Sequence, residues 1–144
     1  KDWWTKEDAA KFTMKSKAVV DQYNAYVAID TFHINGALTL GENIADIGGL
    51  AIAFDAFRMT QQSRDGKLID GLTPEQRFFL SFATIWGIKL KDEFMKVLAK
   101  TDVHSPAEFR VLGPLSNFTP FYEAFKLKKG DNMWKDEEDR IVIW

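Results

Sequence analysis

Two acidic residues, Glu42 and Asp46, stand four positions apart within the segment GENIAD. On a helix this spacing places both carboxylates on one face, about one turn apart. One interpretation is a solvated acidic patch at a helix start, where the macrodipole stabilises negative charge. The apolar neighbours Ile44 and Ile47, with Gly48, favour burial of at least one carboxylate instead, and a buried acid needs a cation or hydrogen-bond donors. A metal together with its ligating histidine would supply both.

A second group of candidate residues lies further along the chain. His104 follows Asp102 by two positions in a segment that we expect to be a loop, and Arg110 stands six residues later. A loop histidine is most often a surface residue and a helical arginine a salt-bridge partner, so each alone says little. Together they suit an anionic centre, because a histidine can stabilise an oxyanion and a guanidinium can bind a carboxylate or carbonyl. The other histidine, His33, is interpreted as structural.

Helix signals dominate the elements that must position these groups. Three predicted helices begin at a Thr that is followed three residues later by an acid or amide, and they span about residues 6–26, 40–62 and 74–100. Two shorter helices are expected from the Ser105-Pro106 cap to about Val111 and from Thr119-Pro120 to about Phe125. We therefore predict an all-α fold, with at most one short strand at either end.

The remaining segments carry weaker predictions. The adjacent Gly48 and Gly49 lie inside a predicted helix, which suggests that another backbone crosses there, and Gly113-Pro114 is expected to break the chain. The other predicted segments are a connector or short extended segment over residues 30–38, a polar loop over 126–140 and an apolar tail over 141–144 that docks on the body.

Composition limits the class of protein. The chain has 144 residues, with 19 Lys and Arg against 21 Asp and Glu, a formal net charge of −2 and no Cys. We expect a single domain over residues 1–144, with no basic face for nucleic acid. The most apolar stretch, residues 47–54, is too short for a transmembrane helix. Because the chain starts at Lys1-Asp2 without an initiator Met, we expect it to be part of a longer protein.

The motifs, taken together, resemble the C-terminal part of the neprilysin-like zinc metallopeptidases (family M13). This family includes neprilysin, the endothelin-converting enzymes and bacterial endopeptidases of the PepO type. The matching segments follow the family order: Trp3-Trp4-Thr5, Gln22-Tyr23, Asn35-Gly36, Thr39 to Asp46 with Gly48-Gly49-Leu50, Phe78-Phe79-Leu80, Thr101 to Pro106, Phe109-Arg110-Val111, Ala124-Phe125 and Trp144. The resemblance implies a mainly α-helical fold like the helical subdomain of thermolysin-like zinc peptidases.

The resemblance also implies a role for each candidate residue. Glu42 would be the third zinc ligand, completing a site whose two histidines come from an HExxH helix. Asp46 would accept a hydrogen bond from the free ring nitrogen of a zinc-binding histidine. His104 would donate to the oxyanion that forms when water attacks the peptide carbonyl, with Asp102 holding the imidazole in place. Arg110 would bind the substrate's backbone carbonyl or terminal carboxylate. Asn43 is assigned no chemistry.

The main departure from the family is that HExxH occurs nowhere in the 144 residues. Two zinc ligands and the catalytic glutamate base would therefore come from an upstream part of the protein. We expect this chain alone to bind zinc poorly and to lack peptidase activity, because one carboxylate cannot make a three-ligand site. In the whole protein the resemblance implies one Zn²⁺ ion and oligopeptide substrates. Without the upstream part, apolar residues such as Trp3, Trp4, Phe12 and Ile52 would favour self-association.

Vertebrate members of the family carry disulfides in this region, at positions where this chain has Ala18, Gly87, Leu127 and Ile141. This difference favours a bacterial member, with an extracytoplasmic location (periplasmic or lipid-anchored) preferred over the cytoplasm. The alternative function is a non-catalytic helical interaction module derived from the same fold. The intact set of acids, histidine and arginine argues against that alternative.

Overall fold

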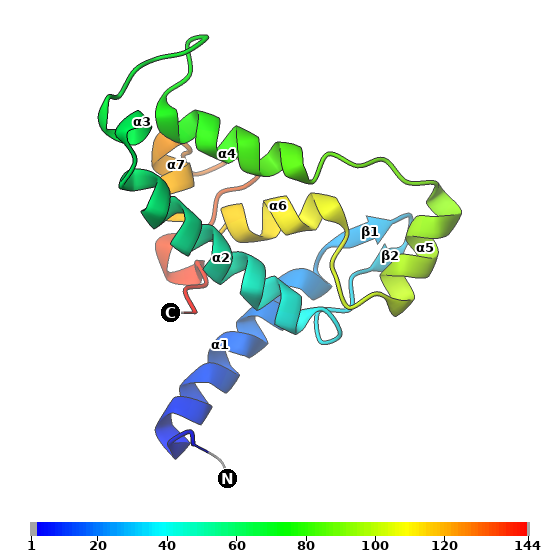
Figure 1. The fold of residues 1–144 in the computed structure, drawn as a ribbon. Coiled ribbons are helices and arrows are strands. Elements are labelled where there is room, and N and C mark those ends of the chain that lie inside the picture. Colours follow the sequence, from blue (N-terminus) through cyan, green and yellow to red (C-terminus); the bar gives the residue numbers. More distant parts are fainter. Residues whose placement is uncertain (1–2, 144) are drawn as a thin grey trace.

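Helices α2 (Leu40–Arg58) and α6 (Ala107–Leu115) pack against each other at the centre of the computed structural model, which describes residues 3–143 (Figure 1). Around this pair, α1 packs on α2, α4 packs on α7, and α5 packs on a two-stranded hairpin. The other elements are α1 (Lys6–Asn24), β1 (Val27–Ile29), β2 (Phe32–His33), α3 (Gln61–Arg64), α4 (Pro74–Ile85), α5 (Asp92–Thr101), α7 (Thr119–Phe125) and the short 3-10 helix η1 (Glu137–Asp139). The predicted fold class, mainly α-helical, is confirmed.

β2 lies within residues 30–38, the stretch predicted to be a connector or short extended segment, and β1 lies just before that stretch. β1 pairs with β2 in an antiparallel hairpin between α1 and α2, with Val27 opposite His33 and Ile29 opposite Phe32. Asp30 makes the tight turn possible with a φ of 51°, a left-handed conformation that Asp tolerates better than most residues. The expectation of at most one strand at either end was therefore wrong, because the short β-branched run before the turn has a partner only a few residues away.

Two of the predicted helix starts are confirmed in detail. The hydroxyl of Thr5 accepts a 3.0 Å hydrogen bond from the Asp8 amide. Thr73 and Gln76 form a full capping box, with bonds of 3.2 Å from the Gln76 amide and 3.0 Å from the Thr73 amide. Thr39 does not cap α2 through its side chain, and its hydroxyl instead donates to the Asn35 carbonyl at 3.1 Å. Its side chain is thereby turned to the preceding loop.

Three helix boundaries differ from the prediction. The second predicted helix ends at Arg58, and the last residues assigned to it belong to α3. The third is two helices, α4 and α5, separated by a non-helical stretch over residues 86–91 that includes Gly87. Because apolar residues recur at helical spacing on both sides of this stretch, the hydrophobic periodicity did not predict the break. The predicted chain break at Gly113-Pro114 was wrong, because α6 continues through both residues to Leu115.

Of the predicted pair Gly48-Gly49, Gly49 makes no close approach to another part of the chain, whereas Gly113, which was not predicted to, does. A Cβ on Gly49 would meet nothing within 4 Å, whereas a Cβ on Gly113 would lie 2.1 Å from the Tyr23 hydroxyl oxygen. Tyr23 is fully buried, so its ring has little room to move away. Gly113 is therefore required where α1 crosses α6, and for Gly49 the expected backbone crossing was wrong.

The core consists of two apolar clusters that share the central helix pair. One contains Val19 and Tyr23 of α1 with Phe109 of α6, and the other is a group of stacked and edge-to-face phenylalanines around Phe54 and Phe79. The C-terminal tail docks as predicted as far as Ile143, which is 6% exposed and belongs to the first cluster. Trp144, Lys1 and Asp2 lie outside the described residues. No helix within residues 3–143 is long and apolar enough to cross a bilayer.

Candidate active site

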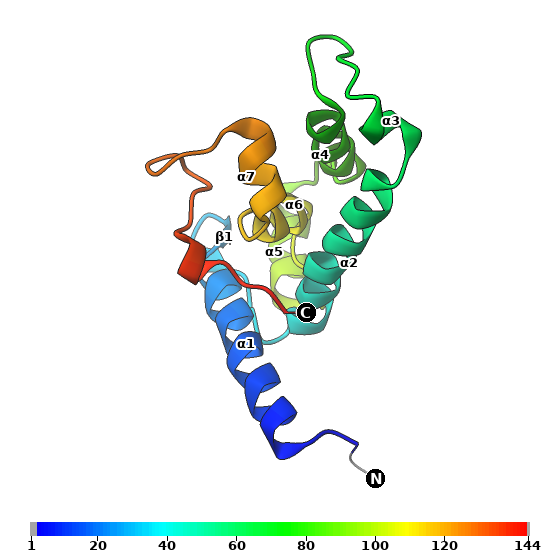
Figure 2. The ribbon, with the colours of Figure 1, turned by 90° about the vertical axis from the view of Figure 1, so that its left-hand side faces the viewer.

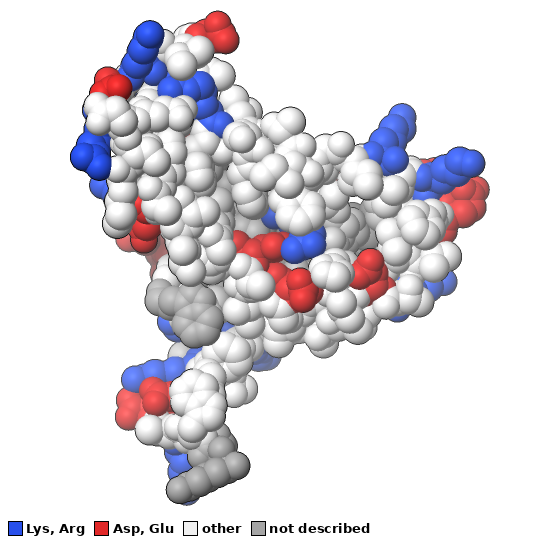
Figure 3. Space-filling view, in the orientation of Figure 1, with Lys and Arg blue, Asp and Glu red and all other residues white. Residues whose placement is uncertain are grey.

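All five residues singled out in the sequence meet on one face of the molecule. Glu42 and Asp46 lie one turn apart on the first half of α2, Arg110 lies on α6, and Asp102 and His104 come from the segment between α5 and α6. In Figure 3, acidic and basic side chains gather in the hollow at the middle of this face, over α2 and α6. The packing of α2 on α6 brings the two groups of candidates together.

His104 stands between two carboxylates. Its Nδ1 lies 2.8 Å from Oδ1 of Asp102, and its Nε2 lies 3.2 Å from Oε2 of Glu42. Asp102 also accepts a 2.8 Å hydrogen bond from the backbone N–H of His104. Because a carboxylate oxygen only accepts, both ring contacts can be hydrogen bonds only when the imidazole is protonated. Asp102 thus fixes the ring, and Glu42 faces its second nitrogen.

Arg110 is held in one orientation by two neighbours. Its Nε and one terminal nitrogen each donate a 2.7 Å hydrogen bond to Asp46, which makes a bidentate pair between side chains that are 17% and 12% exposed. The guanidinium carbon lies 4.1 Å from the centre of the Trp86 ring. Its nearest contact with Glu42 is 4.0 Å. The bidentate hydrogen bonds and the stacking on Trp86 together restrict the guanidinium far more than a single ion pair would.

The surroundings shift the pKa values of three groups in or beside the site, Asp102, Arg110 and Tyr23. The hydrogen bond from the backbone N–H of His104, followed by that from its ring, lowers the pKa of Asp102. The hydrogen bonds to Asp46 raise the pKa of Arg110, with further contributions from the charges of Asp46 and Glu42. Burial raises the pKa of Tyr23, and Asp46 adds to that shift. At neutral pH Asp102 is therefore an anion, Arg110 a cation and Tyr23 a neutral phenol.

Glu42 is the one residue of the candidate site that the family resemblance implied as a metal ligand. Across residues 3–143, no group of three or more His, Asp or Glu side chains is arranged to hold a metal ion. A catalytic zinc needs three protein ligands. Glu42 fits the part of one ligand, since its side chain is 41% exposed and its contacts within the described chain involve Oε2 alone.

Sequence analysis missed three residues around the site. Asn43, which follows Glu42, is fully buried, and its amide oxygen accepts a 2.7 Å hydrogen bond from the Ser105 hydroxyl. Ser105 was assigned to a helix cap, but α6 begins without a side-chain cap. Trp86 falls inside the helix predicted over residues 74–100, whereas it caps the C-terminal end of α4 and stacks on Arg110. The one signal available in the sequence for Asn43 was an amide, a weak helix former, directly after Glu42 inside a predicted helix.

A cavity of about 410 Å³ opens beside this group. His104, Arg110 and Asp102 form part of its wall, and most of the remaining wall is apolar, with Ile85, Trp86, Met95 and Leu98 among its residues. The combination of a mostly apolar wall with a few convergent charged groups is typical of ligand-binding sites.

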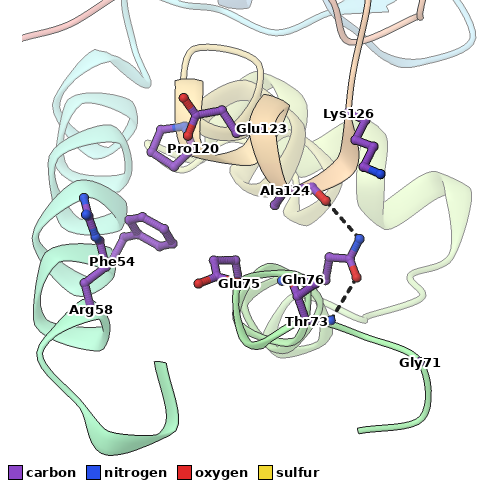
Figure 4. Close-up of a pocket in the computed structure, with 10 residues that line it drawn as sticks. All are labelled: Phe54, Arg58, Gly71, Thr73, Glu75, Gln76, Pro120, Glu123, Ala124 and Lys126. Carbon is purple, nitrogen blue, oxygen red and sulfur yellow. Dashed lines mark hydrogen bonds between the residues drawn. The ribbon is translucent and has the colours of Figure 1, made fainter. Parts of the chain in front are cut away.

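A second cavity, of about 640 Å³, is larger but contains none of the predicted residues. Figure 4 shows it between the end of α2, the start of α4 and α7, with Arg58, Glu75, Glu123 and Lys126 around it. The Gln76 amide bridges part of this wall, donating to the Ala124 carbonyl at 2.9 Å. The smaller cavity is the candidate site, because Asp102, His104 and Arg110 are all part of its wall.

Comparison with known proteins agrees with the motifs. Residues 1–141 match the family described as Peptidase family M13. Neprilysin of Homo sapiens is 39% identical over 148 residues, covering 99% of this chain and 20% of neprilysin. The zinc metalloprotease ZMP1 of Mycobacterium tuberculosis, crystallised with an inhibitor, superimposes with a TM-score of 0.95 at 39% identity, covering 100% of this chain and 23% of ZMP1. PepO of Lactobacillus rhamnosis superimposes with a TM-score of 0.85 at 30% identity, covering 100% of this chain and 21% of PepO.

The chain spans about a fifth of the length of the curated relatives that it matches. Within that span the similarity runs from end to end, in the sequence of neprilysin as in the backbone of ZMP1. The sequence match and the superimposed fold lead to the same assignment, and this chain belongs to peptidase family M13.

Proposed function

We propose that residues 1–144 are the C-terminal portion of the catalytic domain of a zinc-dependent metalloendopeptidase that hydrolyses oligopeptides. The observation that carries the proposal is the meeting of Glu42 with His104, at 3.2 Å, next to an arginine fixed by two hydrogen bonds to Asp46. These groups come from two parts of the chain, and His104 and Arg110 are part of the wall of one cavity. The set suits peptide hydrolysis, because negative charge develops on the carbonyl oxygen as water adds and cationic donors stabilise it.

In this proposal Glu42 is one of three protein ligands of a single Zn²⁺ ion, and two histidines come from residues that this chain does not contain. The metal, when bound, supplies Lewis-acid polarisation and an activated water. The chain alone would then bind zinc weakly and have no peptidase activity. Its physical partner would be the part of the protein that carries the histidines and the general base.

His104 is proposed to stabilise the oxyanion. Nδ1 of His104 is held by the ionised Asp102, and Nε2 faces Glu42 in the absence of substrate, so Nε2–H is the group that can donate to an oxyanion when the ring carries its second proton. A substrate carbonyl oxygen that enters between His104 and Glu42 would take that donor as its charge develops. Asp102 contributes by orientation and by keeping the imidazolium stable, as a buried acid does for a catalytic histidine in general.

Arg110 is proposed to bind the substrate's backbone carbonyl or terminal carboxylate. Asp46 and Trp86 occupy one edge and one face of the guanidinium, and its second terminal nitrogen makes no hydrogen bond within residues 3–143. Asp46 keeps free lone pairs on both oxygens, so it can still accept a hydrogen bond from a metal-ligating histidine. The apolar wall of the cavity favours a substrate with a bulky apolar side chain next to the cleaved bond.

An extracytoplasmic location, periplasmic or lipid-anchored, is part of the proposal. The name of one relative, membrane metallo-endopeptidase-like 1 of Homo sapiens, which is 38% identical, associates that protein with a membrane. A chain without Cys places no redox requirement on the compartment, so an oxidising location is compatible with it.

The test is to express this segment together with its upstream coding sequence and to assay hydrolysis of unlabelled oligopeptides by mass spectrometry. We expect activity that a chelator abolishes and Zn²⁺ restores, and a loss of at least about 1,000-fold in kcat for Glu42→Ala, because a ligand is removed. Glu75→Ala, a half-buried glutamate at the other cavity, is the matched control and should retain activity. Without an HExxH upstream, or with full activity in Glu42→Ala, the proposal fails and the non-catalytic interaction module becomes the better account.

A further inference from the structure

Asn43 connects the two halves of the candidate site. Its side chain is fully buried, and both ends of the amide are used. Its Nδ2 donates to the Thr39 hydroxyl at 2.9 Å, and its Oδ1 accepts from the Ser105 hydroxyl at 2.7 Å. Thr39 precedes α2, and Ser105 directly follows His104. A continuous chain of hydrogen bonds therefore links the helix that carries Glu42 to the loop that carries His104.

The Ser105 link is the stronger of the two polar side-chain contacts that join residues 102–106 to α2 within the described part of the protein. The other, from His104 to Glu42, joins side chains that are 44% and 41% exposed, so water screens it. Ser105 is 4% exposed and Asn43 is at 0%, so breaking their bond would leave buried polar atoms unsatisfied. The buried bond therefore decides how far the His104 loop stands from α2.

We propose that Asn43 and Ser105 are positioning residues that set the separation between the Glu42 carboxylate and the His104 imidazole. The expected effect of these residues on catalysis rests on the proposed function. Their effect on the position of the His104 loop relative to α2 rests on the hydrogen bonds alone. Asn43 is fully buried, and the hydroxyl of Ser105, a residue of the cavity wall, is engaged in its hydrogen bond to Asn43. Each acts through its neighbour, Asn43 through Glu42 and Ser105 through His104, because each is adjacent to it in the chain.

The first test is amide hydrogen exchange in the 144-residue chain, followed at the backbone N–H of His104, which donates to Asp102. Ser105→Ala removes the hydroxyl, and we expect exchange at His104 to accelerate by at least about tenfold while the Val19 and Phe79 amides in the core stay protected. Ser116→Ala is the matched control, because Ser116 is equally buried, at 6% exposure, and its hydroxyl donates to the Gly113 carbonyl on α6. Unchanged exchange at His104 in Ser105→Ala, or the same acceleration in Ser116→Ala, would overturn the proposal.

If Ser105→Ala loses protection everywhere, Thr39→Val decides the matter. It keeps the shape of residue 39 and removes the acceptor of the Asn43 amide, so it weakens the same chain of hydrogen bonds at its other end. We expect faster exchange at His104 with an intact core, and no change at His104 would contradict the link.

The second test separates this inference from the proposed function. In the longer protein, Ser105→Ala should lower kcat by about tenfold or more with KM within about twofold, while Ser116→Ala changes neither. A fall in kcat of the same size in both variants would count as general destabilisation and refute a positioning role. If the unsubstituted longer protein hydrolyses no peptide, the proposed function fails, and the exchange result still decides whether Asn43 and Ser105 hold the loop.

Discussion

At the scale of single residues, the pair between Asp46 and Arg110 shows how the surroundings decide what a charge can do. An exposed arginine would sample many conformations, but this one is confined by two hydrogen bonds and an indole ring. The restriction lowers the entropy that a ligand must remove when it binds the guanidinium. A lysine at position 110 could not reproduce the fork or the stack.

Replacing Asp46 should therefore destabilise the chain. Asp46→Asn removes the charge and leaves a guanidinium that is 17% exposed without its anion, and we expect a loss of about 1–3 kcal/mol in the free energy of unfolding. Asp21→Asn is the matched control, because Asp21 pairs with Lys17 on the surface of α1, where both side chains are more than half exposed. That change should stay within about 0.5 kcal/mol. Urea unfolding of the 144-residue chain measures the free energy of unfolding of both variants. Equal losses would contradict a larger contribution to stability from the pair of Asp46 and Arg110 than from a surface ion pair.

A second residue-scale consequence concerns Lys135, whose ammonium group is partly buried. It donates to Gln22 at 2.6 Å and to Asn117 at 3.0 Å, and burial lowers its pKa to about 8, with the nearby Asp139 acting in the opposite sense. The unfolded chain, with an ordinary lysine pKa of about 10.4, then binds more protons than the folded chain at intermediate pH. The stabilising contribution is complete above the unfolded value and is lost as the pH falls through about 8.

The free energy of unfolding should accordingly rise between about pH 8 and pH 10 in a manner that depends on Lys135. Lys135→Met should flatten the rise, whereas Met in place of the exposed Lys67 should leave it intact. The range stops near pH 10 because the raised pKa of Tyr23 makes folding less favourable above it. Urea titrations at several pH values give the curves, and identical slopes for the original chain and Lys135→Met would refute the assignment.

At the scale of elements, the crossing of α1 over α6 depends on a missing side chain. Tyr23 lies against Gly113, and its hydroxyl is 3.4 Å from the Phe109 carbonyl on the same helix. A glycine inside a helix costs about 1 kcal/mol relative to alanine, so its presence in α6 is justified by the contact it permits. Gly49 has the same helical cost on α2 without such a contact.

Alanine substitutions at these two glycines should thus act in opposite directions. Gly113→Ala should destabilise the chain by about 1–3 kcal/mol, because the added methyl overlaps a tyrosine ring that is fully buried. Gly49→Ala should stabilise it by about 0.5–1 kcal/mol, since the position is helical and open. The midpoints of urea unfolding provide the comparison, and a stabilising Gly113→Ala would show that α1 and α6 are not tightly packed at this point.

At the scale of the whole molecule, large apolar side chains remain exposed. The first half of α1 extends away from the other elements in both ribbon views (Figures 1 and 2), and Trp3 before it is 85% exposed. Ile52 on α2 is 71% exposed and Ile85 at the end of α4 is 75% exposed. Trp4 and Phe12, named with them in the sequence, are only partly exposed. Such residues are candidates for the surface that the rest of a family M13 protein would cover.

The isolated chain should therefore self-associate. Sedimentation velocity over a range of concentrations should show dimers or larger species that increase with concentration, and Ile52→Glu should shift the distribution toward monomer. Leu68→Glu serves as a control, because Leu68 is 60% exposed in the loop before α4 and isolated from these helices. A monomer at every concentration would contradict the expectation.

What the sequence determined by itself is what depends on near neighbours. The caps at Thr5 and Thr73, the helical phase that sets Glu42 and Asp46 on one face, and the family motifs all follow from residues within a few positions of one another. Hydrogen bonds at helix ends and the 3.6-residue period are local rules, so a single sequence is enough to apply them. For that reason the sequence predicted the helical fold class and the position of Glu42 and Asp46 on one helix face.

Only the tertiary structure decided which distant groups meet. Asp46 contacts Arg110, Asn43 contacts Ser105, and Trp86 turns out of the helical path onto the guanidinium, all across more than twenty positions of the chain. The requirement for glycine at position 113 likewise comes from Tyr23 on another helix. These contacts arise when α1, α2 and α6 bury their apolar faces against one another. The hydrophobic effect that drives this packing is non-directional, so contacts between distant residues have no fixed spacing in the sequence that would predict them.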